Sequence, residues 1–352
     1  MWTLQTLNTD ISTVKLVSTD RPADRNHQIF LRVDRFALTS NVITYAILGD
    51  ELGYWQLFPA DQGWGHVPTW GFAEVISSSV EGIASGARYF GLVPMASHFT
   101  MTGSVSRLGF RARDDHRVDL NPVYNQYAAV DIADENTLGL KALLHPLFIT
   151  SNVLHRYLSE NDWFGAEQII VTSASSKTAI GFAFLARASI SLIGATSKSN
   201  EGFVRSLALH DRVYTYSDIF TAFGQPSVLI DFSGDRTRLA KLAAQEGAEN
   251  LRRIIQVGYT HVEQSSTSTP PLRDTRAEVF WAPGMIETYV RRDGPDQFDA
   301  ELSQSLQRFA QWIKMHTSTS YIDGPDSLAN AYRRLYDGKV RPTELLIARP
   351  NR

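Results

Sequence analysis

A turn rich in hydroxyl side chains joins a predicted buried strand to a predicted helix between residues 167 and 187. The apolar run 169–171 predicts the strand, and the apolar spacing from about Thr178 to Arg187 predicts the helix. A parallel strand that enters a helix through a tight turn presents the N-terminus of that helix, where backbone N–H groups and the helix dipole attract phosphate. The chemistry predicted for this turn is therefore phosphate binding.

The turn lacks the glycines that usually let the main chain approach a pyrophosphate. Ser173, Ser176 and Ala179 occupy the positions that glycines take in a dinucleotide-binding turn. Serine hydroxyls donate hydrogen bonds, and a lysine at a helix N-terminus adds a full positive charge. We expect side chains to bind the pyrophosphate, with a turn that only connects strand and helix as the alternative. The residues expected there are Ser173, Ser175, Ser176, Lys177 and Thr178.

A second phosphate interpretation compares SSKT (175–178) and VLID (228–231) with the lysine and aspartate of a P-loop nucleotide site. The P-loop pattern requires glycine at the positions of Val171 and Ser176, and neither residue is a glycine. A loop that encloses a triphosphate without those glycines is sterically unfavourable. The sequence therefore favours a dinucleotide over a triphosphate.

The composition of the 352-residue chain excludes several other kinds of site. The absence of cysteine excludes disulfides, thiolate nucleophiles and cysteine-ligated zinc. A net charge of −3 argues against nonspecific binding to nucleic acid, and no apolar run approaches the roughly 20 residues of a membrane span. The polar N-terminus is not typical of a secretion signal. We expect a cytoplasmic protein without a nucleic-acid or membrane partner.

Histidines are the remaining candidates for a metal site. His66, His98 and His261 could ligate a metal, but no two histidines have helical i, i+4 spacing beside a carboxylate motif. We therefore expect no bound metal.

The periodicity of the sequence divides the chain into two domains. Residues 1–136 contain short β-type runs separated by glycine, proline and aspartate, namely IFLRVDRFAL, VITYAIL, GFAEVIS, YFGLVPM and YAAV. From about residue 137 helical spacing begins, and strand candidates then alternate with helices, which is typical of a parallel sheet covered on both faces. These strand candidates are 168–172, 190–194, 212–216, 227–232, 253–257 and 277–281, followed by helices near 297–315 and 325–337 and a closing strand ELLIA.

Several motifs occur along the chain in the order known from one enzyme superfamily. They are NVITYAILGD (41–50), PTWGFAEV (68–75), GARYFGLVP (86–94), YNQYAAV (124–130), FITS (148–151), SLIGATSKSN (191–200) and LYDGKVRPTELLI (335–347). Together they resemble the zinc-free quinone oxidoreductase and enoyl reductase branch of the medium-chain dehydrogenase/reductase superfamily. The likeness is greatest to an uncharacterised subgroup with the turn SASSKTA in place of the glycine-rich loop.

The resemblance implies an α/β fold, with a Rossmann-type doubly wound parallel sheet in residues 138–290. It implies a GroES-like β-barrel domain in residues 1–137, completed by 291–352, with the substrate in a cleft between the two. Asn41 stands where zinc-binding relatives have a cysteine, which agrees with a zinc-free site. The resemblance also places Thr150 against the nicotinamide, and Tyr216 and Gly258 at the cofactor.

The loop after the second Rossmann strand indicates which nicotinamide cofactor is bound. An acidic residue at this point selects NADH by binding the ribose 2′-hydroxyl, but no carboxylate precedes Glu201. Hydroxyls and a lysine suit a 2′-phosphate, so Thr196, Ser197 and Lys198 favour NADPH. An ordinary solvated polar loop remains the alternative.

These features predict a zinc-independent, NADPH-dependent reductase that transfers hydride to an activated C=C or C=O bond of an apolar small molecule. Enones, quinones and enoyl thioesters are the substrate types that the resemblance implies, as is a homodimer formed through a sheet edge. Tyr45 is the candidate proton donor, with a tyrosine of the β-domain core as the alternative. The rival function is a non-catalytic or repurposed relative that binds another ligand or a protein partner.

Overall fold

The computed structural model describes residues 1–21, 23, 26–130, 135–257 and 274–352. The expected cofactor residue Gly258 and the candidate ligand His261 lie outside the described residues. The chain forms two compact units, Met1–Leu143 with Ser318–Arg352 (unit 1) and Leu144–Thr317 (unit 2). Among the described residues, no helix combines the length and the apolar character needed to cross a bilayer.

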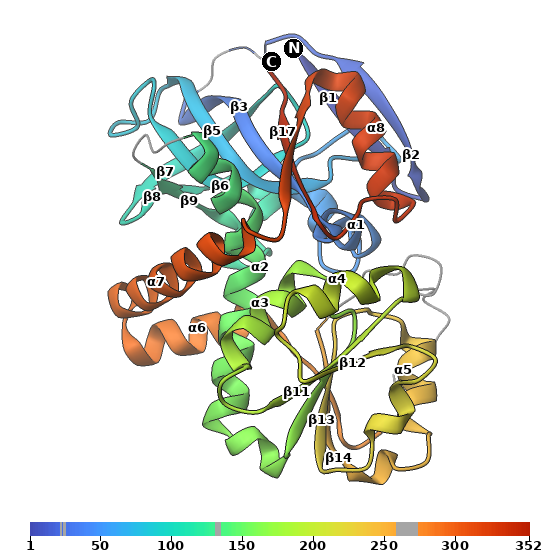
Figure 1. The fold of residues 1–352 in the computed structure, drawn as a ribbon. Helices are drawn as coiled ribbons and strands as arrows, with labels where there is room; N and C mark the ends of the chain where they lie inside the picture. Colours follow the sequence, from blue (N-terminus) through green and yellow to red (C-terminus); the bar gives the residue numbers. More distant parts are fainter. Residues whose placement is uncertain (22, 24–25, 131–134, 258–273) are drawn as a thin grey trace. The chain divides into compact units, whose positions relative to one another are not determined.

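Unit 1 is built around a closed barrel of six strands (Figure 1). The barrel closes because one edge of β3 is shared, with its first half paired to β7 and its last residues paired to β17. The other edge of β3 pairs with β5, and the order continues through β6, β9 and β8 to β7. The expected GroES-like barrel is therefore confirmed. Its strands are β3 (Gln28–Leu38), β5 (Pro68–Ser78), β6 (Arg88–Pro94), β7 (His98–Ser106), β8 (Gly109–Ala112) and β9 (Gln126–Ala129).

Further elements surround the barrel within unit 1. A small antiparallel sheet has the order β2-β1-β4, and strand β16 lies parallel to β17. Helix α8 contacts β1, β2 and β16. The bounds are β1 (Trp2–Leu7), β2 (Asp10–Ser18), α1 (Ser40–Ile47), β4 (Trp64–Gly65), β16 (Ser318–Asp323), α8 (Gly324–Tyr336) and β17 (Glu344–Arg349), with 3-10 turns at Tyr54–Gln56, Asp115–Arg117 and Pro122–Asn125.

The run VITYAIL was expected to form a strand. This prediction is wrong, because residues Ser40–Ile47 form helix α1. Its β-branched and aromatic residues are typical of a strand. Their spacing is helical, however, since the buried residues Val42, Ile43, Tyr45 and Ala46 lie on one face of a helix. Burial of that face determines the structure here and outweighs the propensity of the individual residues.

Unit 2 contains a six-stranded parallel sheet in the order β12-β11-β10-β13-β14-β15. The chain begins at the centre with β10, moves outward to β12 and then returns to the other side of β10 with β13. This is the order of a Rossmann fold, whose ligands bind where the strand order reverses, at the carboxyl ends of the strands. The expected doubly wound sheet is therefore confirmed, with its switch point between β10 and β13.

The elements of unit 2 follow the expected alternation of strands and helices, with an additional helix, α6. They are α2 (Glu135–Glu160, which begins in unit 1), β10 (Gln168–Val171), α3 (Lys177–Ala186), β11 (Ser191–Thr196), α4 (Glu201–Ser206), β12 (Arg212–Thr215), β13 (Ser227–Asp231), α5 (Arg236–Ala243), β14 (Leu251–Gln256), β15 (Ala277–Val279), α6 (Ala282–Asp293) and α7 (Pro295–Ile313), with 3-10 turns at Asp162–Gly165, Lys198–Asn200, Ile219–Ala222 (η6) and Ala248–Asn250.

The division into units differs from the expected one at two places: residues 138–143 belong to unit 1, and residues 291–317 belong to unit 2 and not to the barrel domain. Helix α7 is amphipathic, and its buried aromatic residue Phe309 explains this placement. The ring of Phe309 stacks on Phe148 of α2 with 4.9 Å between centroids and also contacts Phe184 of α3. Helix α7 therefore completes the hydrophobic core of unit 2.

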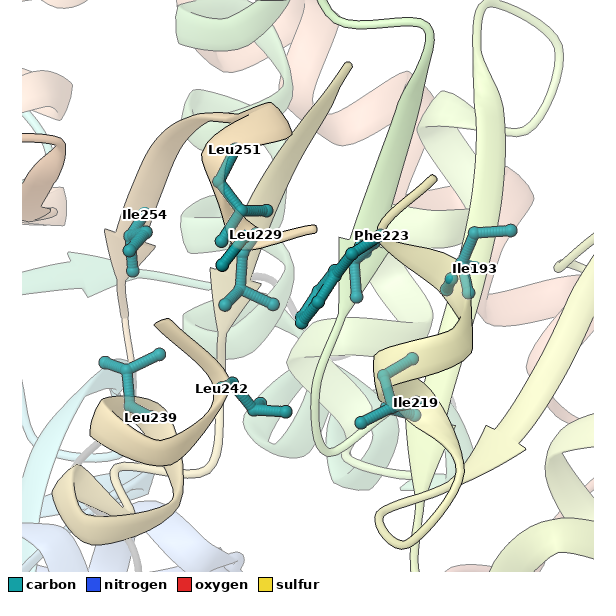
Figure 2. Packing of buried hydrophobic residues seen from close by; sticks show 12 residues of the cluster. Ile193, Ile219, Phe223, Leu229, Leu239, Leu242, Leu251 and Ile254 are labelled. Atoms are coloured by element: carbon teal, nitrogen blue, oxygen red, sulfur yellow. The ribbon is translucent and has the colours of Figure 1, made fainter. Parts of the chain in front are cut away.

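One face of the parallel sheet is covered by η6 and α5. Figure 2 shows their side chains directed at the apolar residues of the strands, so that α5 is held on the sheet by two buried leucines. Because those leucines fix one side of α5, its remaining side chains are presented to the surface beside η6. The labelled residues of this core are Ile193, Ile219, Phe223, Leu229, Leu239, Leu242, Leu251 and Ile254.

His210 lies partly buried beside the sheet, with both ring nitrogens shielded from solvent. Gly194 of β11 accommodates the His210 ring, because a Cβ at the glycine would lie 3.0 Å from it. Neither ring nitrogen of His210 has a hydrogen-bond partner among the described residues. Burial lowers the pKa of His210 to about 4, against a smaller opposite effect from Asp211.

This pKa predicts how stability depends on pH. Unfolded histidine titrates near 6.5, so the unfolded chain takes up this proton first and stability is lost as the pH falls from about 6.5 to about 4. The loss expected from His210 alone is about 3 kcal/mol. Urea unfolding of the wild type and His210→Leu across this pH range measures it, and the variant should show a flatter profile. Parallel profiles would contradict the assignment.

Candidate cofactor-binding site

The hydroxyl-rich turn lies at the carboxyl end of β10 and starts α3. Ser176 is the N-cap of the helix, and its Oγ accepts a hydrogen bond from the backbone N–H of Ala179 at 3.3 Å. This cap satisfies one of the four N–H groups that a helix N-terminus leaves without a partner in the helix. Lys177 and Thr178 follow in the first turn and are half-buried. The expected phosphate residues are thus gathered around a helix N-terminus.

Ser173 adopts a backbone conformation that usually requires glycine. Its φ is 49°, in the left-handed region that costs an L-residue about 1–2 kcal/mol. The backbone N–H of Ser173 donates a hydrogen bond to the hydroxyl of Tyr216 at 3.0 Å. The turn therefore keeps the shape of a glycine turn, but Tyr216 takes up one of its N–H groups.

Ser175 joins the turn to the loop after β11. Its Oγ accepts hydrogen bonds from the Thr196 hydroxyl at 3.3 Å and from the side-chain amide of Asn200 at 3.1 Å. Thr196 is buried, so this bond fixes the end of β11 against the turn. The sequence did not single out Asn200, although it lies in the polar segment that was expected to bind the ribose.

The cation of the expected 2′-phosphate loop is already paired. The Lys198 ammonium lies 2.7 Å from the Glu201 carboxylate, and the Lys198 side chain is 85% exposed. Glu201 also binds Arg205 at 2.9 Å, and hydrogen bonds from Lys198 and Arg205 lower the pKa of the Glu201 carboxyl. Ser197 is hydrogen-bonded to Ser199. This loop therefore offers hydroxyls, and its lysine shares one carboxylate with Arg205.

A buried carboxylate connects the two strands at the switch point. Asp231, at the end of β13, accepts hydrogen bonds from the Thr172 hydroxyl at 2.5 Å and from the Ser233 hydroxyl at 2.6 Å. The backbone N–H groups of Ser233 and Gly234 also donate to it, each at 3.1 Å. With both oxygens occupied, Asp231 holds the strand ends together, and the P-loop interpretation loses its metal-binding aspartate.

Thr150 lies on α2, which the structure ties to the start of α3. The Thr150 hydroxyl donates to the carbonyl of Pro146 at 3.4 Å, next to the point where the proline interrupts the helical hydrogen bonds. The neighbouring Ser151 donates to the carbonyl of Thr178 at 2.8 Å. Gly181 permits this approach, since a Cβ there would lie 2.8 Å from the Ser151 Oγ. The α2 segment is thus positioned on the phosphate turn.

A pocket of about 410 Å³ opens on the surface of unit 2 beside the turn. Tyr216 belongs to both, because its hydroxyl binds the Ser173 N–H and its ring lines the pocket. This pocket was not predicted from the sequence, although Arg238, Lys241 and Leu242 of α5 and Gln245 just beyond it follow the i, i+3, i+4, i+7 spacing of one helix face. The lining residues are Tyr216, Ser217, Phe220, Asp235, Thr237, Arg238, Lys241, Leu242 and Gln245.

In unit 1, Tyr45 is buried on α1 within a group of aromatic hydroxyls. Its hydroxyl oxygen accepts a hydrogen bond from the Trp70 indole N–H at 3.1 Å, and its ring lies 4.6 Å from that of Tyr54. The Tyr54 hydroxyl is in turn hydrogen-bonded to Tyr124 at 2.9 Å. Burial raises the pKa of Tyr45, so its phenol remains protonated at neutral pH.

No group of three histidine, aspartate or glutamate side chains suited to a metal occurs in the described part of the chain. The Nδ1 of His66 lies 3.1 Å from each of the backbone carbonyls of Phe58 and Pro59. The ring of His98 stacks on Phe30. Two of the three candidate ligands thus have structural contacts of their own, and they do not form a common site.

A family model described as "Protein of unknown function (DUF2855)" matches residues 36–341. The chain belongs to this family. No curated protein matches it.

Solved structures share the fold at low sequence identity. CurA from Vibrio vulnificus is 13% identical, with a TM-score of 0.64 and 99% of each chain covered. The quinone oxidoreductase from Thermus thermophilus is 17% identical, with a TM-score of 0.54 and coverage of 99% of this chain and 100% of that one. The quinone oxidoreductase from Coxiella burnetii is 16% identical, with a TM-score of 0.56 and 99% of each chain covered. The likeness confirms the fold expected for a medium-chain dehydrogenase/reductase.

Proposed function

We propose that this chain is an NADP(H)-dependent oxidoreductase that reduces an activated C=C or C=O bond of an apolar small molecule. The observation that carries the proposal is the hydroxyl-lined turn at the N-terminus of α3, at the switch point of a Rossmann sheet and hydrogen-bonded to the end of β11. The solved structures of CurA and of the Thermus quinone oxidoreductase include complexes with NADPH, which supports the choice of cofactor. We infer that the turn SASSKTA marks a subgroup of that reductase branch.

The residues of the turn fit a pyrophosphate. Backbone N–H groups of the first turn of α3 and the hydroxyls of Ser175 and Ser176 are donors, and Lys177 supplies the positive charge. Asp231 keeps the two strand ends in register beneath them. In this proposal Thr150 lies against the nicotinamide, whose contribution when bound is the transfer of hydride.

Tyr45 is the proposed proton donor. Its oxygen already accepts the Trp70 N–H, so the phenolic proton is free to be directed toward another acceptor. A phenol whose pKa is raised by burial stays protonated and can transfer its proton to the strongly basic carbanion or alkoxide left after hydride addition. The buried position of Tyr45 also agrees with the alternative of a core tyrosine.

A repurposed relative that binds a different ligand is the second candidate. Two observations favour it: Tyr216 occupies the Ser173 N–H, and Glu201 compensates Lys198. Both reduce the number of donors available to a dinucleotide phosphate.

An activity assay separates the two candidates. The purified chain is mixed with NADPH and one acceptor in each of three parallel reactions. The acceptors are cyclohexenone, benzoquinone and crotonyl-CoA, and the nicotinamide absorbance is followed. A reductase consumes NADPH with at least one of these acceptors. A chain that neither binds NADPH nor consumes it with any of these acceptors would favour the repurposed relative.

A further inference from the structure

The pocket of about 410 Å³ beside the phosphate turn contains a guanidinium held in a fixed position. Asp235, the N-cap of α5, accepts a hydrogen bond from the Arg238 backbone N–H at 2.8 Å and pairs with its Nη2 at 3.0 Å. The guanidinium lies over the Tyr216 ring, 3.9 Å from its centroid. Arg238 is thus oriented before any ligand binds.

One donor of this guanidinium is unsatisfied. The Nη1 of Arg238 is buried and has no hydrogen-bond partner among the described residues. Buried polar atoms in folded proteins nearly always have a partner, so an acceptor supplied by a ligand or water is expected here. An anionic oxygen is the acceptor that a guanidinium binds most strongly.

Lys241 adds a net positive charge to the same pocket. It lies one helical turn after Arg238 on α5, and its exposed side chain forms no hydrogen bond or ion pair with any residue that the structure describes. Because Asp235 neutralises Arg238, Lys241 leaves the three charged lining residues with a net charge of +1. Lys198, in contrast, is paired with Glu201.

The pocket is joined to the phosphate turn by a single side chain. The Tyr216 hydroxyl is hydrogen-bonded to the turn, and the Arg238 guanidinium lies over the Tyr216 ring. A ligand that places a diphosphate at α3 therefore has a second, cationic site on the other side of Tyr216. A nucleotide with a further phosphate on its ribose carries an anionic group for each of these two sites.

We propose that this pocket binds the phosphorylated ribose at the adenosine end of the cofactor, with Lys241 and Arg238 contacting the 2′-phosphate. The inference rests on the proposed function and deepens it. The preference for NADPH then comes from α5, and the loop residues Thr196 and Lys198 contribute little to it.

Charge removal at two lysines tests this assignment. Kd values of the full-length chain for NADPH, NADH and 2′,5′-ADP are measured by calorimetry for the wild type, Lys241→Gln and the matched control Lys198→Gln. In Lys241→Gln, loss of a charged hydrogen bond should raise the Kd for NADPH and for 2′,5′-ADP by about tenfold or more. The Kd for NADH should be unchanged. Lys198→Gln should change each of the three Kd values by less than about threefold.

The possible failures are distinguishable. If the wild type binds NADPH and Lys241→Gln leaves the NADPH/NADH ratio unchanged, or Lys198→Gln lowers it, the pocket assignment is wrong and the proposed function survives. If the wild type binds neither dinucleotide, the proposed function fails and the pocket assignment fails with it. Because Lys241 is exposed, its substitution is not expected to unfold the chain.

Discussion

Replacing Asp231 by alanine is expected to lower the free energy of unfolding of unit 2 by about 3–5 kcal/mol. The substitution removes the acceptor of the hydroxyls of Thr172 and Ser233 and of the N–H groups of Ser233 and Gly234. Asp231 and Ser233 are almost fully buried, so water cannot easily replace the carboxylate. Buried donors left without an acceptor cost about 1–3 kcal/mol each, with partial relaxation.

Urea denaturation followed by circular dichroism measures this loss. Glu246→Ala is the matched control, because it also removes a carboxylate from unit 2 but at an exposed position, where a change within about 0.5 kcal/mol is expected. An Asp231→Ala variant as stable as the control would show that the carboxylate does not hold β10 and β13 together.

Replacing Tyr45 by phenylalanine is expected to lower kcat by about 10²–10⁴-fold while leaving the Kd for NADPH unchanged. The variant keeps the ring that packs on Tyr54 and loses only the hydroxyl that accepts the Trp70 N–H. A proton donor acts in the transition state, so its loss affects kcat, whereas a core tyrosine affects stability alone.

The matched control is Tyr54→Phe. Tyr54 is also buried, and its hydroxyl is hydrogen-bonded to Tyr124, so the stability costs of the two variants should be similar. We expect its kcat to stay within about threefold of the wild type. Steady-state rates with the best acceptor compare the two. Equal kcat values for both variants would exclude Tyr45 as the proton donor.

Much of the fold could be predicted because its signals are local. The mostly apolar run of β3 and the continuous apolar runs of β10 and β13 identify strands directly. Helix α1 was mistaken for a strand because its eight residues are rich in β-branched and aromatic types. The extent of unit 2 depended on the contact of Phe309 with Phe148, which sequence spacing does not reveal.

The candidate site was predictable in its position but not in its contacts. The turn at 173–178 is local, and the structure places it at the N-terminus of α3. The hydrogen bonds from Ser173 to Tyr216 and from Asn200 to Ser175 join residues 43 and 25 positions apart. Only the parallel sheet brings them together, so their partners could not be inferred from spacing. The same holds for the contact of Arg238 with Tyr216.

We infer that a turn of serines and a lysine binds the diphosphate of NADPH without the usual glycines. Calorimetric titration of the full-length chain with NADPH, for the wild type and Lys177→Ala, tests it most directly. We expect saturable binding of one NADPH per chain, weakened in Lys177→Ala without loss of fold, and a stability gain of about 2.7 kcal/mol at 100 times the Kd. No heat and no change in Tm at about 1 mM NADPH would contradict it.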